Sequence, residues 1–128
     1  MTPDAQHRRA SAYRRRAERR GRIAETIARL LLNLKGYRIV ASRLRTPVGE
    51  IDLLARRGGV LAVVEVKTRP TLADAGDAVS YAQRHRLARA AVAVLAGRTD
   101  LAGLTVRFDA VLVPRRGWPR HLPDAWRP

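Results

Sequence analysis

The chain has 128 residues, of which 46% are hydrophobic, which is enough for one domain around a single core. It contains no cysteine, which excludes disulfide bonds and cysteine-based metal sites. Lysine and arginine number 26 against 11 acidic residues, a formal net charge of +15, which favours a polyanionic partner with a phosphate backbone over a merely solubilising surface.

No apolar run is long enough to span a bilayer, and the arginine-rich beginning of the chain lacks the apolar segment of a secretory signal. The basic residues are also not gathered on one amphipathic helix with bulky apolar residues opposite. We therefore expect a cytoplasmic protein with no membrane partner.

The first part of the chain changes character at Gly21. Residues 1–20 are polar and rich in arginine, which is typical of a flexible or loosely helical arm that touches nucleic acid. From Gly21 to Lys35 the helical spacing of apolar residues predicts an amphipathic helix that ends at Gly36. Its apolar stripe comprises Ile23, Ile27, Leu30, Leu31 and Leu34.

Three strands are predicted next. Residues 37–45 alternate apolar and polar side chains, and residues 46–49 form a turn. Residues 50–55 and 60–67 are separated only by Arg-Arg-Gly-Gly, so they form an antiparallel hairpin. The second of these strands begins apolar on both faces, so we expect it to be central and covered on both sides.

A second helix is predicted from Asp77 to Ala96, followed by a last strand over residues 104–113. Residues 114–128 contain four prolines and are not expected to continue regular structure. The order helix, three strands, helix, strand predicts an α/β domain with a mixed sheet over residues 21–113, between a basic arm and a proline-rich tail.

Carboxylates are set into the hairpin, the most hydrophobic stretch of the chain. Asp52 and Glu65 lie at similar distances from the turn, so we expect them to be near one another across the ladder. Two neighbouring carboxylates repel, and partial burial penalises their charged forms, so a cation would complete the arrangement. Hard oxygen ligands suit Mg²⁺ or Mn²⁺, which polarise a phosphodiester and activate water.

Lys67 shares a strand face with Glu65, where it could orient an attacking water or stabilise developing charge. The simpler alternative is a strand-end salt bridge of Glu65 or Asp52 with Lys67 or Arg69. The convergence of three acids with one of only two lysines favours the metal site.

Asp52 and Glu65-Val66-Lys67 resemble the D…E-x-K signature of the PD-(D/E)xK nuclease superfamily, with Ile51 in place of the usual proline. Residues 21–113 also resemble the YraN-like family of bacterial proteins, which is described as endonuclease-like, through the blocks GRIAETIARLLLNLKGYRIVASRLRTPVGEIDLLAR, VVEVKTRP, DAVSYAQRHRLARAAVAVL and VRFDAVLV. The resemblance implies a restriction-endonuclease-like core, as in archaeal Holliday-junction resolvases. It also implies a metal-dependent endonuclease that acts on DNA, including branched or recombination intermediates.

The resemblance implies that Asp52, Glu65 and the backbone carbonyl of Val66 bind the metal and that Lys67 is catalytic. It also points to Glu25 in the first helix as a further acid. Because Glu25 lies opposite the predicted apolar stripe, it reaches the site only if that second face also packs, and a solvent-facing acid is an equal alternative.

Two further polar residues are candidates for support of the site. Glu50 alternates onto the Asp52 face, although a charge at the strand rim is equally plausible. Gln83 stands where the family often has lysine, which puts any lysine-dependent step in doubt. It falls on the apolar stripe of the second helix, where the site would supply partners for a buried amide; alternatively it lies at the edge of the stripe and bonds water.

Basic residues flank the hairpin, and we expect some of them to contact phosphates: Arg43, Arg45, Arg56, Arg57 and Arg69.

The alternative to a nuclease is a catalytically weak or silent nucleic-acid-binding protein, for DNA or RNA. A basic structural protein associated with RNA would leave the hairpin acids unexplained. Resolving a junction requires two cuts, which favours a homodimer, although the sequence shows no diagnostic interface.

The remaining candidates have simpler interpretations. Asp109 is expected to form a structural salt bridge with Arg107 or a neighbour. Trp118 and Trp126 are expected to pack the tail onto the domain rather than to stack on bases. The three histidines show no ligand spacing and are predicted to be surface residues: His7, His85 and His121.

Overall fold

A computed structural model of the chain describes residues 3–69 and 79–127. None of the described helices is both long enough and apolar enough to cross a membrane. The elements, in chain order, are α1 (Pro3–Leu34), β1 (Arg38–Thr46), β2 (Gly49–Arg57), β3 (Val60–Arg69), α2 (Tyr81–Gly97), the short 3₁₀ helix η2 (Thr99–Leu101), β4 (Thr105–Pro114) and β5 (Arg120–Trp126).

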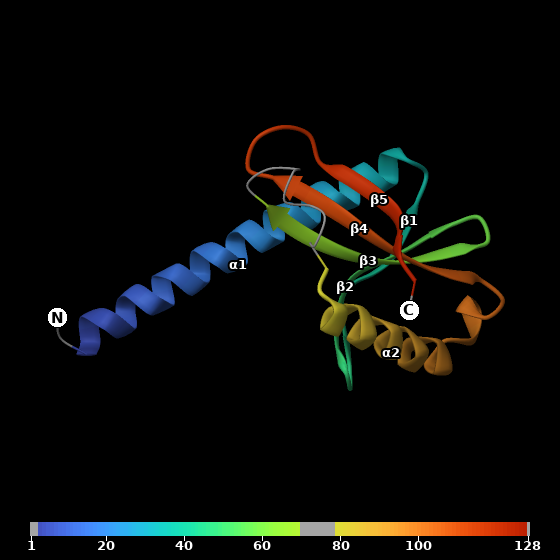
Figure 1. Cartoon of the computed structure of the whole chain (residues 1–128), viewed down its shortest axis with the longest axis horizontal. Coiled ribbons are helices and arrows are strands. Elements are labelled where there is room, and N and C mark those ends of the chain that lie inside the picture. The colour runs from blue at the N-terminus through green and yellow to red at the C-terminus, as the bar shows by residue number, and fades with distance from the viewer. Residues whose placement is uncertain (1–2, 70–78, 128) are drawn as a thin grey trace.

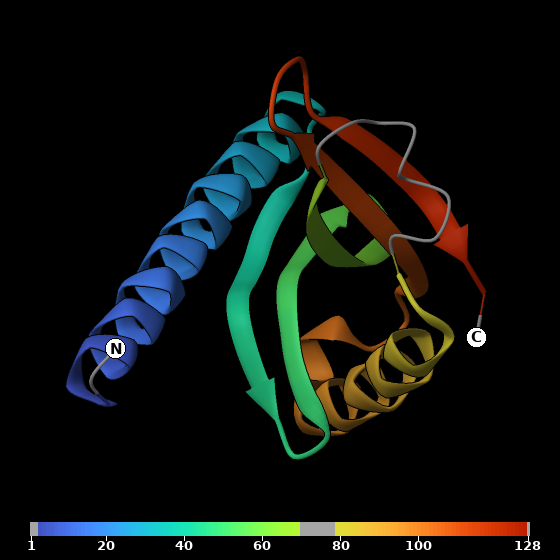
Figure 2. The same cartoon turned by 60° about the vertical axis from the view of Figure 1, so that its left-hand side comes forward.

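The strands form one mixed sheet in the order β1-β2-β3-β4-β5. Neighbouring strands are antiparallel except β3 and β4, which run parallel because the chain crosses over through α2 between them. The two helices lie on opposite sides of the sheet (Figures 1 and 2). The predicted α/β class, mixed sheet and β2–β3 hairpin are therefore confirmed, with β5 as an additional strand.

The central strand β3 separates two apolar clusters. Leu61 and Val63 pack into the cluster on the α2 side, while Ala62 and Val64 pack into the cluster on the α1 side. The alternation of side chains along an extended strand produces this division. The prediction that this strand is central and covered on both faces is confirmed.

Helix α1 differs from its prediction in length and in orientation. It begins at Pro3 rather than at Gly21, so the basic segment is helical and projects beyond the sheet (Figure 1). Its contact with nucleic acid stays a prediction. The helix packs through Ala24, Ala28 and Leu32, while the predicted stripe was wrong for three exposed side chains: Ile23, Leu30 and Leu34. Alanine lets the helix approach the sheet closely, which bulky side chains on that face would prevent.

Helix α2 begins at Tyr81, later than predicted, because Ser80 caps it. The Ser80 hydroxyl accepts the backbone N–H of Gln83, and the Gln83 side-chain oxygen accepts the backbone N–H of Ser80. This reciprocal capping box sets the start of the helix. Asp77, the predicted start, lies outside the described residues.

The tail after β4 forms a strand, which corrects the prediction of irregular structure. β5 lies at the sheet edge, and Pro123 falls at an irregularity between the pairs Ala110↔Leu122 and Phe108↔Trp126. A missing N–H is tolerated at such a position. Trp126 is buried with its ring 5.6 Å from that of Phe108, as predicted, whereas Trp118 is 88% exposed and does not pack.

Asp109 holds the tail to the domain. Its fully buried carboxylate accepts two hydrogen bonds from Arg107, one from the backbone N–H of Asp124, and lies 2.8 Å from His121 Nε2. Burial alone would raise the pKa of Asp109, but these bonds outweigh it and lower the pKa to about 2. The predicted Asp109–Arg107 salt bridge is confirmed; the surface location of His121 was wrong, because its ring is buried and its Nδ1 contacts Lys35 Nζ.

Candidate active site

The site lies where β2 and β3 separate. Their ladder ends at the pair Leu53↔Val64, while β3 continues beside β4 to Arg69. Asp52 Oδ2 accepts the backbone N–H of Val66 at 2.9 Å. The carboxylate thus satisfies a strand donor that β2 no longer pairs, and this bond holds Asp52 against β3.

Asp52 and Glu65 come together at this separation. Burial raises the pKa of Asp52 to about 7, and repulsion from the adjacent Glu65 carboxylate adds to the effect, which the Val66 N–H partly offsets. At neutral pH the ionised forms of Asp52 and Glu65 therefore repel one another. Two neighbouring carboxylates in a partly buried site require compensating positive charge.

Lys67 supplies part of that charge. Its Nζ lies 3.2 Å from Glu65 Oε1, so the strand-end salt bridge considered for the sequence is present. The other oxygen, Oε2, is buried and has no hydrogen-bond partner among the described residues. A hydrogen bond between the Asp52 and Glu65 side chains contributes to the raised pKa of Asp52, so Glu65 gains a partner only while Asp52 carries its proton. When both carboxyls are ionised, the salt bridge to Lys67 leaves Oε2 unsatisfied, which is costly.

The donor set fits a hard divalent cation. Glu65 Oε2 is unpartnered, Asp52 stands beside it, and Mg²⁺ or Mn²⁺ commonly takes one or two carboxylates and completes its coordination with water and phosphate. Across residues 3–69 and 79–127, no group of three or more histidine and acidic side chains is arranged to hold a metal. The backbone carbonyl of Val66, implied as a ligand by the resemblance, is on the strand segment between Glu65 and Lys67.

Glu25 faces the sheet rather than solvent. It follows Ala24 on the packed side of α1, its side chain is only 18% exposed, and its charge reaches Asp52. Glu25 Oε2 lies 2.6 Å from the Nε of Arg43 on β1. The second helix face therefore packs, which brings Glu25 to the rim of the acid pair, where Arg43 holds its carboxylate.

Arg43 takes an unusual conformation to reach Glu25. Its φ is +50°, in the left-handed region that non-glycine residues rarely adopt, and the β1–β2 register places it opposite Asp52. The carboxylates of Glu25, Glu50 and Asp52 all interact with its guanidinium and, after the Glu25 hydrogen bond, raise its pKa. Arg43 is therefore a β1 cation that interacts with three acids at once.

A polar hollow of about 550 Å³ opens between α1 and the β1–β2 hairpin. Its lining consists of one glycine and five charged residues: Gly21, Arg22, Glu25, Arg43, Arg45 and Glu50. Arg45 and Glu50 are partners in the β1–β2 register. The hollow thus gathers four of the residues predicted from sequence and adds Arg22, which sequence reasoning missed although it lies one helical turn before Glu25.

Other predicted residues lie away from the acids. Arg56 and Arg57 are near the opposite end of β2, where Arg57 donates to the Lys35 carbonyl and its guanidinium stacks 4.6 Å from the Tyr37 ring centre. The side chain of Arg69 lies outside the described residues. The Gln83 side-chain amide is part of the capping box of α2, where its oxygen accepts the Ser80 backbone N–H. It neither faces the acid pair nor stands at the edge of the stripe bonded only to water, as the two predictions had it.

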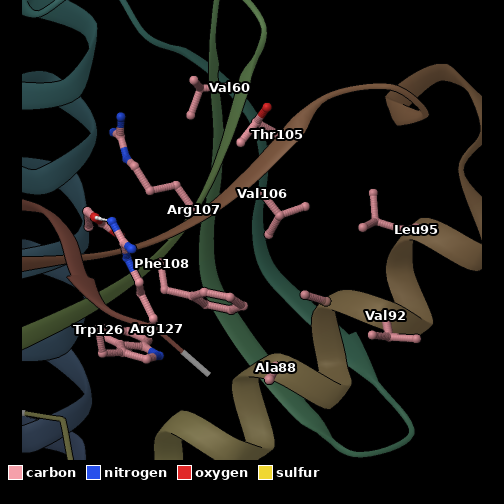
Figure 3. Close-up of a pocket in the computed structure, with 12 residues that line it drawn as sticks. Val60, Ala88, Val92, Leu95, Thr105, Val106, Arg107, Phe108, Trp126 and Arg127 are labelled. Carbon is pink, nitrogen blue, oxygen red and sulfur yellow. Dashed lines mark hydrogen bonds and ion pairs between the residues drawn. The ribbon is translucent and has the colours of Figure 1, made fainter.

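A larger, apolar cavity of about 650 Å³ lies between α2 and the β4–β5 edge (Figure 3). Ala88, Val92 and Leu95 line it from the helix side, and Phe108 and Trp126 from the sheet side. Its one lining carboxylate, Asp124, is paired with Arg127. Among its lining residues this cavity has no pair of acids, and it is lined mainly by apolar side chains.

Comparison with known proteins gives consistent matches over the domain. The model of a family described as "Uncharacterised protein family UPF0102" matches residues 24–113. A UPF0102 protein of Parvibaculum lavamentivorans is 57% identical over 112 residues, covering 88% of this chain and 84% of its own. One from Caulobacter vibrioides is 58% identical over 110 residues, covering 86% and 88%, and one from Paramagnetospirillum magneticum is 52% identical over 115 residues, covering 87% and 89%.

Proposed function

The chain belongs to the UPF0102 family, the YraN-like family, and from that premise and the geometry of its acid pair we propose that it is a metal-dependent endonuclease of the PD-(D/E)xK type. The proposed substrate is DNA, with branched or recombination intermediates as the favoured class. The observation that carries the proposal is the closeness of the half-buried Asp52 carboxyl to the buried Glu65 carboxylate, whose Oε2 accepts no hydrogen bond from an N–H donor among the described residues.

In this proposal Asp52, Glu65 and the Val66 carbonyl hold Mg²⁺ or Mn²⁺. When bound, such an ion polarises a phosphodiester and lowers the pKa of water. Lys67, fixed beside Glu65 at 3.2 Å, orients the attacking water and offsets charge that develops on the phosphate. Because the pKa of Asp52 is about 7, the carboxyl must lose its proton before it binds a cation, so we expect cleavage to increase from acid to neutral pH.

Arg43 and Arg45 are proposed to hold the substrate backbone at the polar hollow, with the arginine-rich helix α1 extending the cationic surface. Contacts of this kind position a duplex and do not read its sequence. They make binding sensitive to salt, because each neutralised phosphate releases counterions. A net charge of +15 supports this assignment.

The test is incubation of the protein with linear, supercoiled and junction DNA in the presence of Mg²⁺ or Mn²⁺, beside Asp52→Asn and a matched control, Asp100→Asn. Asp100 is an exposed acid that pairs with Arg98. We expect metal-dependent cleavage that is lost in Asp52→Asn and kept in Asp100→Asn. Salt-sensitive binding without cleavage in all three proteins would instead support the catalytically silent alternative, and equal cleavage by all three would indicate a contaminating nuclease.

A further inference from the structure

Arg43 and Glu25 form an ion pair in the polar hollow, and an anionic ligand that bound Arg43 would take the place of the Glu25 carboxylate. Arg43 Nε lies 2.6 Å from Glu25 Oε2, and Arg22 and Arg45 line the same hollow. Three guanidinium groups therefore face two carboxylates, those of Glu25 and Glu50. The excess of positive charge in a concave site is suited to a phosphate.

The backbone conformation of Arg43 determines the direction in which its side chain leaves β1. A left-handed φ of +50° in an arginine is strained, and such strain persists where the surrounding structure holds it. The conformation brings the Arg43 guanidinium to Glu25 on α1, at 2.6 Å, while the Arg43 side chain itself stays 42% exposed. The strained backbone of Arg43 thus places its guanidinium beside Glu25, at the edge of the Asp52–Glu65 pair.

Carboxylate and phosphate oxygens are interchangeable partners for a guanidinium fork. We propose that a phosphate of the substrate strand displaces Glu25 from Arg43, and that the released Glu25 carboxylate joins Asp52 and Glu65 as the third acid of the divalent-ion site. This inference rests on the proposed function and adds a regulatory step: the ion site is completed by substrate.

The charges explain why the two ligands favour each other. While Arg43 binds Glu25, two acids and Lys67 face the ion site. Once a phosphate occupies Arg43, the charge of Glu25 is no longer neutralised and lies within reach of Asp52, with which it already interacts unfavourably. A divalent cation relieves that repulsion. Phosphate binding therefore strengthens cation binding, and cation binding must strengthen phosphate binding by the same factor.

The experiment measures Mn²⁺ affinity by electron paramagnetic resonance, with and without a short phosphorothioate duplex. We expect the duplex to tighten Mn²⁺ binding by about tenfold or more in the wild-type protein, within the usual range of coupling between sites. Arg43→Gln frees Glu25 permanently, so this variant should bind Mn²⁺ more tightly without DNA and gain little from the duplex. Glu25→Gln should bind Mn²⁺ weakly in both conditions.

Arg29→Gln is the matched control, because it removes one positive charge from the exposed side of α1, where Arg29 contacts only Thr26 in the described contacts. It should behave as the wild type does. Wild-type Mn²⁺ affinity that is unchanged by the duplex, or coupling that survives in Arg43→Gln, would overturn the exchange while leaving the nuclease proposal intact. Failure of every protein to bind Mn²⁺ in either condition would overturn both.

Discussion

The Asp52 carboxylate accepts the Val66 backbone N–H at 2.9 Å, at the point where β2 leaves β3. Asp52 therefore both replaces a strand partner and lies beside the buried carboxylate of Glu65. Its protonation state consequently links the stability of the hairpin to the chemistry proposed for the site.

We predict that Asp52→Asn stabilises the protein at about pH 8 by roughly 1–3 kcal/mol. The pKa of Asp52 is raised from 3.8 to about 7 by folding, so its stabilising contribution is complete below about pH 4 and is lost as the pH rises to about 7. Asparagine keeps an acceptor for Val66 and carries no charge. Urea unfolding of both proteins between about pH 4 and pH 8 should show curves that diverge with rising pH; parallel curves would contradict the raised pKa.

We predict that Lys67→Gln lowers the rate of DNA cleavage by about 10²-fold or more while Mn²⁺ binding is retained. The amide preserves most of the length of the lysine but removes the charge that lies beside Glu65. Single-turnover cleavage and Mn²⁺ titration on the same preparations separate the two effects. Loss of cation binding together with cleavage would assign Lys67 a structural role.

Asp109→Asn should destabilise the fold by about 3–5 kcal/mol, because Arg107 would lose its buried partner. The pKa of Asp109 is lowered to about 2, so the stability contributed by the wild-type carboxylate is present above about pH 4 and is lost as the pH falls through about 2. Thermal unfolding against pH measures both. The exposed Asp100 gives the control, since Asp100→Asn should change the free energy of unfolding little.

Two substitutions in α1 test which of its faces packs. Ala28 is fully buried against the sheet, so Ala28→Leu should overpack the contact and destabilise the protein by about 1–3 kcal/mol. Leu30 is 59% exposed, so Leu30→Ala should change the free energy of unfolding by less than about 0.5 kcal/mol. Denaturant unfolding that ranks the two variants in the opposite order would contradict the orientation of the helix.

Gly49→Ala should destabilise the β1–β2 turn by about 1–3 kcal/mol. The φ of Gly49 is +139°, and an added Cβ would stand 2.8 Å from Arg86 Cδ. Arg86 would have to move from its place against the hairpin. Gly59→Ala is the control, because an added Cβ there meets nothing within 4 Å. Equal melting temperatures for the two variants would argue against the crowding at Gly49.

Local pattern accounts for the hairpin and for the meeting of its acids. Period-two alternation and a short turn determine which strand positions lie opposite one another, so the closeness of Asp52 and Glu65 could be derived without coordinates. The same alternation predicted the two-sided burial of β3. Family resemblance pointed to Glu25, but the helical pattern left its direction open.

The sequence by itself determined the α/β class, the central strand and the acid pair, because these depend on residues close together along the chain. Only the tertiary structure decided which face of α1 packs, since the closeness of a helix to a sheet depends on small residues such as Ala24 and Ala28 rather than on total hydrophobicity. That orientation brings Glu25 to Arg43. The return of the tail as β5, which buries His121 against Asp109, likewise depends on contacts between segments distant in sequence.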